Sequence, residues 1–163
     1  MNANWQSYIV RSIQKAMVDA AAFTAGTPSD GVYKVFFDGM RVNPEDYTTF
    51  VAHNIGDVRW QPSRARFRMG TVGVTLNCIS DTSTDIHRID EIVGAAMAVY
   101  DRVSLAIMDY PAASPVQIGW IRFTEADVTS TVVQENITGE TGGGAVQIDQ
   151  RNIAFTGRIE IDT

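Results

Sequence analysis

A strict alternation of apolar and polar residues near the end of the chain constrains its fold most. Ile153, Phe155, Gly157, Ile159 and Ile161 alternate with residues that are mostly polar. Successive side chains of a strand point to opposite faces, so this pattern predicts a strand with one buried side. Such a strand belongs to a sheet with a core on one face, and other elements must cover that face.

Two segments have the spacing of amphipathic helices, and these are the elements that could supply the cover. Residues 5–23 carry apolar side chains at i, i+3, i+4 and i+7, and Asn4 precedes them as a candidate N-cap. Residues 85–108 carry a second apolar stripe after the stretch 80–85, which is rich in N-cap residues. We expect a helix at each place.

Further strands are expected at 32–37, 50–60, 65–79, 116–123 and 128–134. The strand 65–79 changes parity, because Phe67 and Met69 are odd-numbered whereas the apolar residues from Val72 to Cys78 are even-numbered. A one-residue bulge would let both sets face one core. In strand 116–123 we expect Val116, Ile118 and Trp120 to form the apolar side.

The order of elements predicts an α+β fold. A mainly antiparallel, twisted sheet with two amphipathic helices packed on one face accommodates one-sided helices and half-polar strands. The 163 residues fit a single domain, 1–163, in which the glycine-rich stretch 135–144 is expected to be a mobile loop.

Charge is distributed unevenly along the chain. The total is −6, but residues 123–163 hold seven acids and two arginines, whereas residues 58–80 hold four arginines and no acid. An acidic protein is a poor general binder of nucleic acid, because phosphate affinity requires positive charge. The asymmetry suits self-association of a basic patch with an acidic one, although solvated surfaces explain it equally well.

Motifs of enzymes and metal sites are absent from the sequence. There is no P-loop, GxGxxG, GxSxG or HExxH pattern. We expect His53 on a strand surface, His87 on a helix surface and Cys78 as a buried thiol. No secretory signal or membrane-spanning run is recognised. We therefore expect no catalytic residues, metal ligands or cofactor, and a structural or interaction protein.

The order and length of these elements resemble the tail-terminator, or tail-completion, proteins of long-tailed bacteriophages. The resemblance rests on the opening helix 5–23, strand 32–37, hairpin 50–79 and helix 85–108, and on a closing strand. That strand is Arg151-Asn152-Ile153-Ala154-Phe155-Thr156-Gly157-Arg158-Ile159-Glu160-Ile161. The resemblance extends over nearly the whole chain.

The resemblance implies a virion structural protein of the tail or neck, assembled in the host cytoplasm, with no enzymatic activity. It implies a homohexameric ring that caps the tail tube, stops its polymerisation and joins it to the head-tail connector or stopper protein. DNA would pass through the ring without specific binding, and no membrane is involved. Part of the acidic C-terminal quarter is then expected to face the DNA.

Ten residues are candidates for the contact between subunits or with partners. They are Arg59, Arg64, Arg66, Arg68, Glu140, Gly142, Gly143, Gly144, Arg158 and Glu160. In a cyclic ring two different patches meet, so the basic hairpin would approach acids of residues 123–163 on the neighbour. Reversal of Arg66 and Arg68 to Glu would then weaken assembly without unfolding the subunit.

Other interpretations remain open from the sequence. The protein could be another neck protein, such as a head-completion or stopper protein. It could also be a small enzyme or ligand-binding domain in which Trp5, Trp60 and Trp120 line a pocket. A nucleic-acid-binding module is disfavoured by the acidity.

Overall fold

The computed structural model describes residues 4–20, 23–24, 33–37, 49–62, 67–81, 87–110, 112–136 and 145–162. The helices are α1 (Trp5–Asp19) and α2 (Arg88–Tyr100). The strands are β1 (Phe23–Thr24), β2 (Tyr33–Phe37), β3 (Thr49–Ile55), β4 (Arg59–Trp60), β5 (Phe67–Asp81), β6 (Ser104–Met108), β7 (Gln117–Phe123), β8 (Asp127–Asn136) and β9 (Ala145–Asp162).

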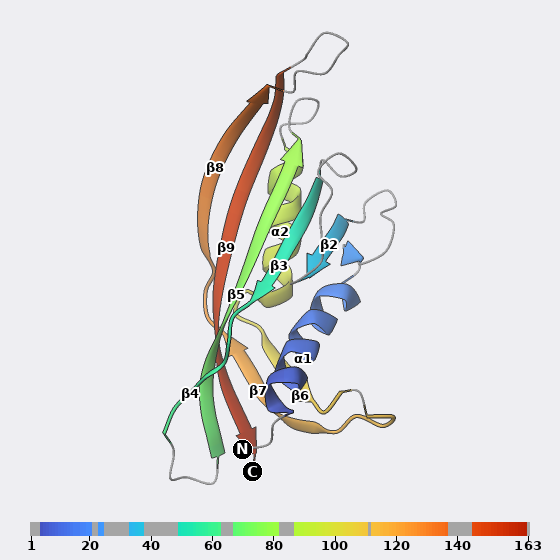
Figure 1. Ribbon diagram of the computed structural model, residues 1–163, viewed down its shortest axis with the longest axis vertical. Helices are drawn as coiled ribbons and strands as arrows, with labels where there is room; N and C mark the ends of the chain where they lie inside the picture. Colours follow the sequence, from blue (N-terminus) through green and yellow to red (C-terminus); the bar gives the residue numbers. More distant parts are fainter. Residues whose placement is uncertain are drawn as a thin grey trace.

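The architecture is mixed α+β, with a strongly curled sheet of mostly antiparallel strands and two helices (Figure 1). The strand order is β1-β2-β3-β5-β9-β7-β6, with β4 paired to β5 and β8 paired to β9. Only β1–β2 and β2–β3 are parallel pairs within the described sheet. The predicted α+β class with a mainly antiparallel, twisted sheet and two helices is therefore confirmed.

The bulge expected within residues 65–79 is not present in the described part of that range, 67–79. β5 pairs with β9 without a register shift from Phe67 to Asp81. The extra residue lies in the other arm of the hairpin, because residues 56–58 between β3 and β4 face only two residues of β5. Phe67 consequently points away from the core, and 42% of its surface is exposed.

The second helix is shorter than its apolar pattern predicted. It ends at Tyr100, and Arg102 adopts a left-handed backbone conformation with φ of 57°. The chain therefore turns, and the apolar residues of 104–108 form β6 instead of a further helical turn. Asp81, which was expected near the helix start, is the last residue of β5. Neither described helix has the length and apolarity needed to cross a membrane.

The core lies on one face of the sheet, called here the inner face. Both helices contribute to it, α1 through Ile9, Ile13 and Met17, and α2 through residues that include Ile92 and Tyr100. The sheet contributes alternate residues, namely Val72, Val74, Leu76 and Cys78 of β5 and Ile153, Phe155, Ile159 and Ile161 of β9. Cys78 is buried as predicted, and burial raises the pKa of its thiol to about 12.

Helix α1 is joined to two separate edges of the sheet by hydrogen bonds. Gln6 Oε1 accepts a hydrogen bond from the backbone N–H of Val58, between β3 and β4, at 3.2 Å. Ser12 Oγ accepts one from the backbone N–H of Met108, on β6, at 3.0 Å. These bonds satisfy backbone donors that the ladders leave unpaired, and they fix α1 across the sheet.

His53 does not lie on a strand surface as expected, because it is fully buried at the centre of the inner face. Tyr100 donates its hydroxyl proton to the carbonyl oxygen of Ile13 at 2.8 Å. His53 Nε2 lies 2.8 Å from the same hydroxyl, and it therefore carries the proton and donates. The chain of bonds joins β3, α2 and α1. Burial lowers the pKa of His53 to about 4.

Gly157→Ala should destabilise the protein by about 1–3 kcal/mol through overpacking. A Cβ at this position would lie 2.7 Å from Ile121 Cγ2 and 3.0 Å from Phe123 Cε1. Urea unfolding measures the effect. Gly73→Ala is the matched control, because its added Cβ meets nothing within 4 Å, and equal losses for the two variants would contradict the packing described here.

The stability of the protein should fall as pH decreases from 6.5 toward 4. Unfolded His53 takes up a proton near its ordinary pKa of 6.5, whereas folded His53 does so only near 4. The unfolded state therefore binds more protons in this window, which costs about 3 kcal/mol in total. Urea midpoints across this pH range measure the loss. His53→Gln should show a shallower decline, and an unchanged slope would exclude His53 as its source.

Candidate functional site

Three arginines form one row across the outer face of the sheet. Arg59 of β4 is the register partner of Thr71, Thr71 is the partner of Arg158 on β9, and Arg158 is the partner of Arg122 on β7. Directly opposite residues on paired strands share a face. The arginine row (Arg59, Arg122 and Arg158) is exposed throughout.

The arginine row has no carboxylate partner among the described residues. The two ion pairs in that part of the chain are Lys15–Asp19 and Arg102–Glu125. Arg122 and Arg158 lie on adjacent strands, about 5 Å apart at their Cα atoms, and like charges directly opposite each other are destabilising. The described part of the subunit therefore leaves these arginines without an ion pair, and an acidic partner surface would supply one.

Apolar side chains border the arginine row on the same face. Glu160 of β9 is opposite Trp120 on β7 and Met69 on β5, and the next residue on that side, Asp162, is opposite Phe67. Trp120 is 45% exposed. The arginine row together with these five residues is called the outer-face patch below.

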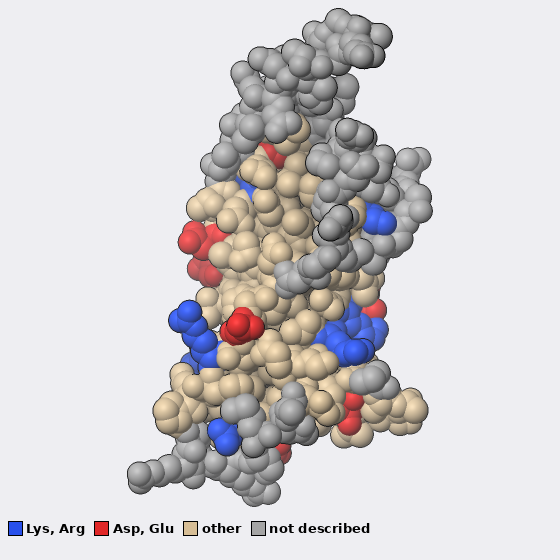
Figure 2. Space-filling model, viewed as in Figure 1, with Lys and Arg blue, Asp and Glu red and all other residues tan. Residues whose placement is uncertain are grey.

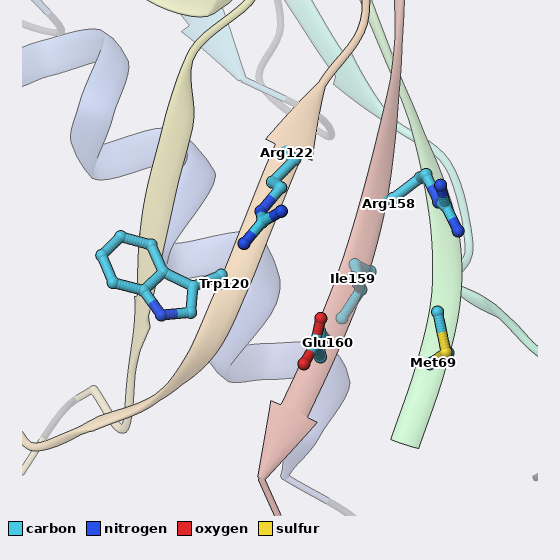
Figure 3. A pocket seen from close by; sticks show the side chains of 6 residues that line it. All are labelled: Met69, Trp120, Arg122, Arg158, Ile159 and Glu160. Carbon is cyan, nitrogen blue, oxygen red and sulfur yellow. The ribbon is translucent and has the colours of Figure 1, made fainter. Parts of the chain in front are cut away.

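Two adjoining depressions lie in the outer-face patch. One, of about 140 Å³, is lined by Met69, Trp120, Arg122, Arg158, Ile159 and Glu160. Figure 3 shows Trp120 and Arg122 projecting from β7, while Arg158 extends from β9 toward β5. The second, of about 350 Å³, lies between Phe67, Trp120 and the two acids of β9. Trp120 and Glu160 border both.

The outer-face patch combines residue types that are common at protein–protein contacts. Tryptophan, arginine and methionine are enriched at interfaces, and tryptophan and arginine are among the residues that dominate binding energy. Within the described residues no three His, Cys, Asp or Glu side chains gather as metal ligands. On the face drawn in Figure 2, charged side chains form small separate groups instead of the broad basic field that phosphate backbones require.

Three of the ten predicted contact residues, Arg59, Arg158 and Glu160, meet in this patch. Arg68 does not join them, because it is opposite the buried Ile161 on the inner face and is partly buried. The other six lie outside the described residues, namely Arg64, Arg66, Glu140, Gly142, Gly143 and Gly144. Of the mobile loop expected at 135–144, Glu135 and Asn136 belong instead to β8, and residues 137–144 lie outside the described residues.

Sequence analysis missed Trp120 and Arg122 because it assigned the wrong side of strand 116–123 to the core. The buried residues are Gly119, Ile121 and Phe123, whereas Trp120 faces outward. Arg122 has the same parity as Trp120, and a strand that exposes the arginine must also expose the tryptophan. The shared parity of Trp120 and Arg122 was therefore the sequence signal that could have identified both side chains as exposed.

The three tryptophans do not line one pocket. Trp5 and Trp60 pack against each other, with ring centroids 5.6 Å apart, and both border the core. Trp120 lies on the opposite face of the sheet. A ligand pocket lined by all three is therefore excluded.

Comparison with known proteins gives distant structural neighbours and no family. No protein-family model matches the chain, and no curated protein matches it. One solved structure, which carries no functional description, is 13% identical, and the match covers 93% of this chain and 94% of that one with a TM-score of 0.49. A likeness at this level carries no functional information.

Arg158→Glu should stabilise the isolated subunit slightly. The change turns the Arg122–Arg158 repulsion into an attraction, worth about 0.2–1 kcal/mol for a cross-strand pair. Urea unfolding at low and high salt measures it, and the gain should shrink in high salt, where exposed charges are screened. Arg158→Gln serves as the neutral control. A loss of stability in Arg158→Glu beyond that of the control would contradict the assigned geometry.

Proposed function

We propose that this chain is a viral structural protein that resembles a phage tail terminator. Copies of it form a homohexameric ring on the last ring of the tail tube, stop tube polymerisation and join the tail to the head-tail connector or stopper protein. DNA passes through the lumen without specific binding. The protein acts by assembly in the host cytoplasm and then in the virion, and it performs no catalysis.

The observation that carries the proposal is the outer-face patch. It combines unpaired arginines, exposed aromatic rings and two depressions on a folded sheet. Opposed arginines do not stabilise an isolated subunit. They become favourable when acidic side chains of a partner lie against them. The patch also contains three of the residues expected at a subunit contact.

The distribution of charge supports contacts between copies. In the proposed ring, basic residues of the hairpin face acids of residues 123–163 on the neighbour, and two different patches meet as a cyclic assembly requires. Arg59 borders one side of the sheet, on β4, and Asp127 is exposed on the other side, at the start of β8. Opposite charges on opposite sides of one sheet favour a head-to-tail contact.

We further infer that both helices cover only the inner face, which keeps the outer-face patch accessible to partners. The shared core of α1, α2 and the inner-face strand residues supports this arrangement. A helix on the outer face would cover the arginine row and leave its charges without solvent, which is a costly arrangement.

Assembly of the purified protein tests the proposal. Light scattering after size exclusion should reveal a species of about 107 kDa, six times the subunit mass of 17.9 kDa, and negative-stain images should show a central hole. If the protein is monomeric alone, rings should form on added tail-tube protein and cap the tubes. Rings that bind a connector but not tubes would indicate a different neck protein. Absence of rings under both conditions would refute the proposal.

The double variant Arg59→Glu/Arg158→Glu identifies the surface in the same experiment. It should weaken assembly by at least about tenfold, since losing about 1.4 kcal/mol per contact has that effect, while the urea midpoint stays unchanged or rises. Arg11→Glu/Arg88→Glu is the matched control, because it makes the same double charge reversal at exposed positions of α1 and α2. Equal assembly of the double variant and the control would remove the arginine row from the contact.

A further inference from the structure

Strand β8 presents a long edge that no described residue pairs with. It is hydrogen-bonded to β9 on one side over its whole length, from Asp127 opposite Ala154 to Asn136 opposite Ala145. The ten residues include no proline, glycine or lysine, and half of them are β-branched. Proteins normally blunt such edges with lysine, proline, bulges or a covering element, because open backbone groups recruit further strands.

At two other edges of the sheet, β6 and the segment next to β4, side chains of α1 accept hydrogen bonds from the backbone. Helix α1 packs along β6, and the Ser12 hydroxyl takes the N–H of Met108 at that edge. Gln6 takes the N–H of Val58 next to β4. At the upper end of the sheet, β1 pairs with β2 on one side only within the described chain. Among the described residues, β8 and β1 are therefore the edges with no further strand and no side-chain hydrogen bond capping their backbone, although α1 also contacts β1.

These two edges lie at opposite ends of one run of strands, β1-β2-β3-β5-β9-β8. One transverse row crosses all six strands through the register partners Thr24, Lys34, Phe50, Ile79, Gln150 and Thr131. The strands β1, β2, β3 and β9 run in one direction and β5 and β8 in the other, as the pairings require. Strand β8 is therefore antiparallel to β1.

We propose that the β8 edge of one copy pairs with the β1 edge of the next copy, so that the sheet continues from subunit to subunit around the ring. This inference rests on the proposed function. A rotation about an axis along the strands preserves their direction, so β8 would meet β1 of the neighbour in the antiparallel sense, which is slightly the more stable pairing. The contact joins two different edges, and such contacts form a ring when the rotation between neighbouring copies closes.

The same arrangement brings the two charged sides of the lower sheet together. Strand β4, with Arg59, lies on the β1 side of the sheet, and the β7–β8 junction, with exposed Asp127, lies on the β8 side. A neighbour placed to pair β8 with β1 would set these opposite charges toward each other. Ring closure also removes the open edges, which protects the assembly from unlimited strand addition.

Disulfide trapping in the assembled protein tests the pairing. The native Cys78 is fully buried, so introduced cysteines report alone. Thr24→Cys is combined in turn with Thr129→Cys, Thr131→Cys or Val133→Cys, three positions that cover neighbouring registers of β8. Mild oxidation of the ring, with tube protein added where assembly needs it, should give a ladder of covalent species up to the hexamer in one register. The control pair Thr24→Cys/Ala154→Cys should give none, because β9 lies between β5 and β8.

Each other outcome overturns the inference in a distinguishable way. Rings without a ladder in any of the three registers would exclude β8–β1 pairing and leave the proposed function standing. A dimer in Thr131→Cys alone would indicate that two β8 edges pair about a twofold axis. A ladder of equal yield from the control pair would mean random collision. Absence of any ring would remove both the proposed function and this inference.

Discussion

The antiparallel ladder between β5 and β9 is the constraint on which the rest of the structure depends. It runs unbroken from Phe67 to Asp81 on β5, and every other strand of the described sheet except β1, β2 and β6 pairs directly with one of these two. Period-two alternation and an unbroken register together assign each residue of both strands to a face. A slip of one residue would exchange the core with the outer-face patch.

On the inner face, ring contacts and hydrogen bonds of Tyr100 join the two helices to the sheet. Tyr100 packs against Phe123 and Phe155, with ring centroids 5.1 and 5.5 Å apart, and its hydroxyl reaches α1 and β3. A buried polar group costs free energy unless it is hydrogen-bonded, so the Ile13, Tyr100 and His53 bonds specify one position for α1. This arrangement requires His53 to remain neutral, so the stability that it gives to the packing of α1 depends on pH.

The outer face has the opposite character. Its arginine row and exposed rings lie outside the hydrophobic core, and like charges opposite each other on adjacent strands are unfavourable. Residues of this kind make sense energetically when a second surface supplies acids and excludes water. The proposed ring would give partners to both the outer-face patch and the β8 edge. Neither has a partner among the described residues of one copy.

The sequence by itself determined the features that depend on local patterns of apolar and polar residues. The alternation from Ile153 to Ile161, the core of both helices and the burial of Cys78 follow from period and polarity, and the structure confirms them. The coarse fold class follows from the same patterns. The exposure of Arg158 and Glu160 also follows from the pattern, since they alternate with buried isoleucines, whereas their predicted role in a subunit contact stays a prediction.

Tertiary structure decided what local patterns leave open. Period shows which residues share a face, but long-range pairing decides which face is buried, and for this reason Trp120 is exposed and His53 is buried. Helix α2 ends at Tyr100, and the left-handed conformation of Arg102 turns the chain into β6, although the apolar pattern continues through both elements. The arginine row joins positions 59, 122 and 158, whose proximity arises only from the register of four strands, and no local signal in a sequence encodes that register.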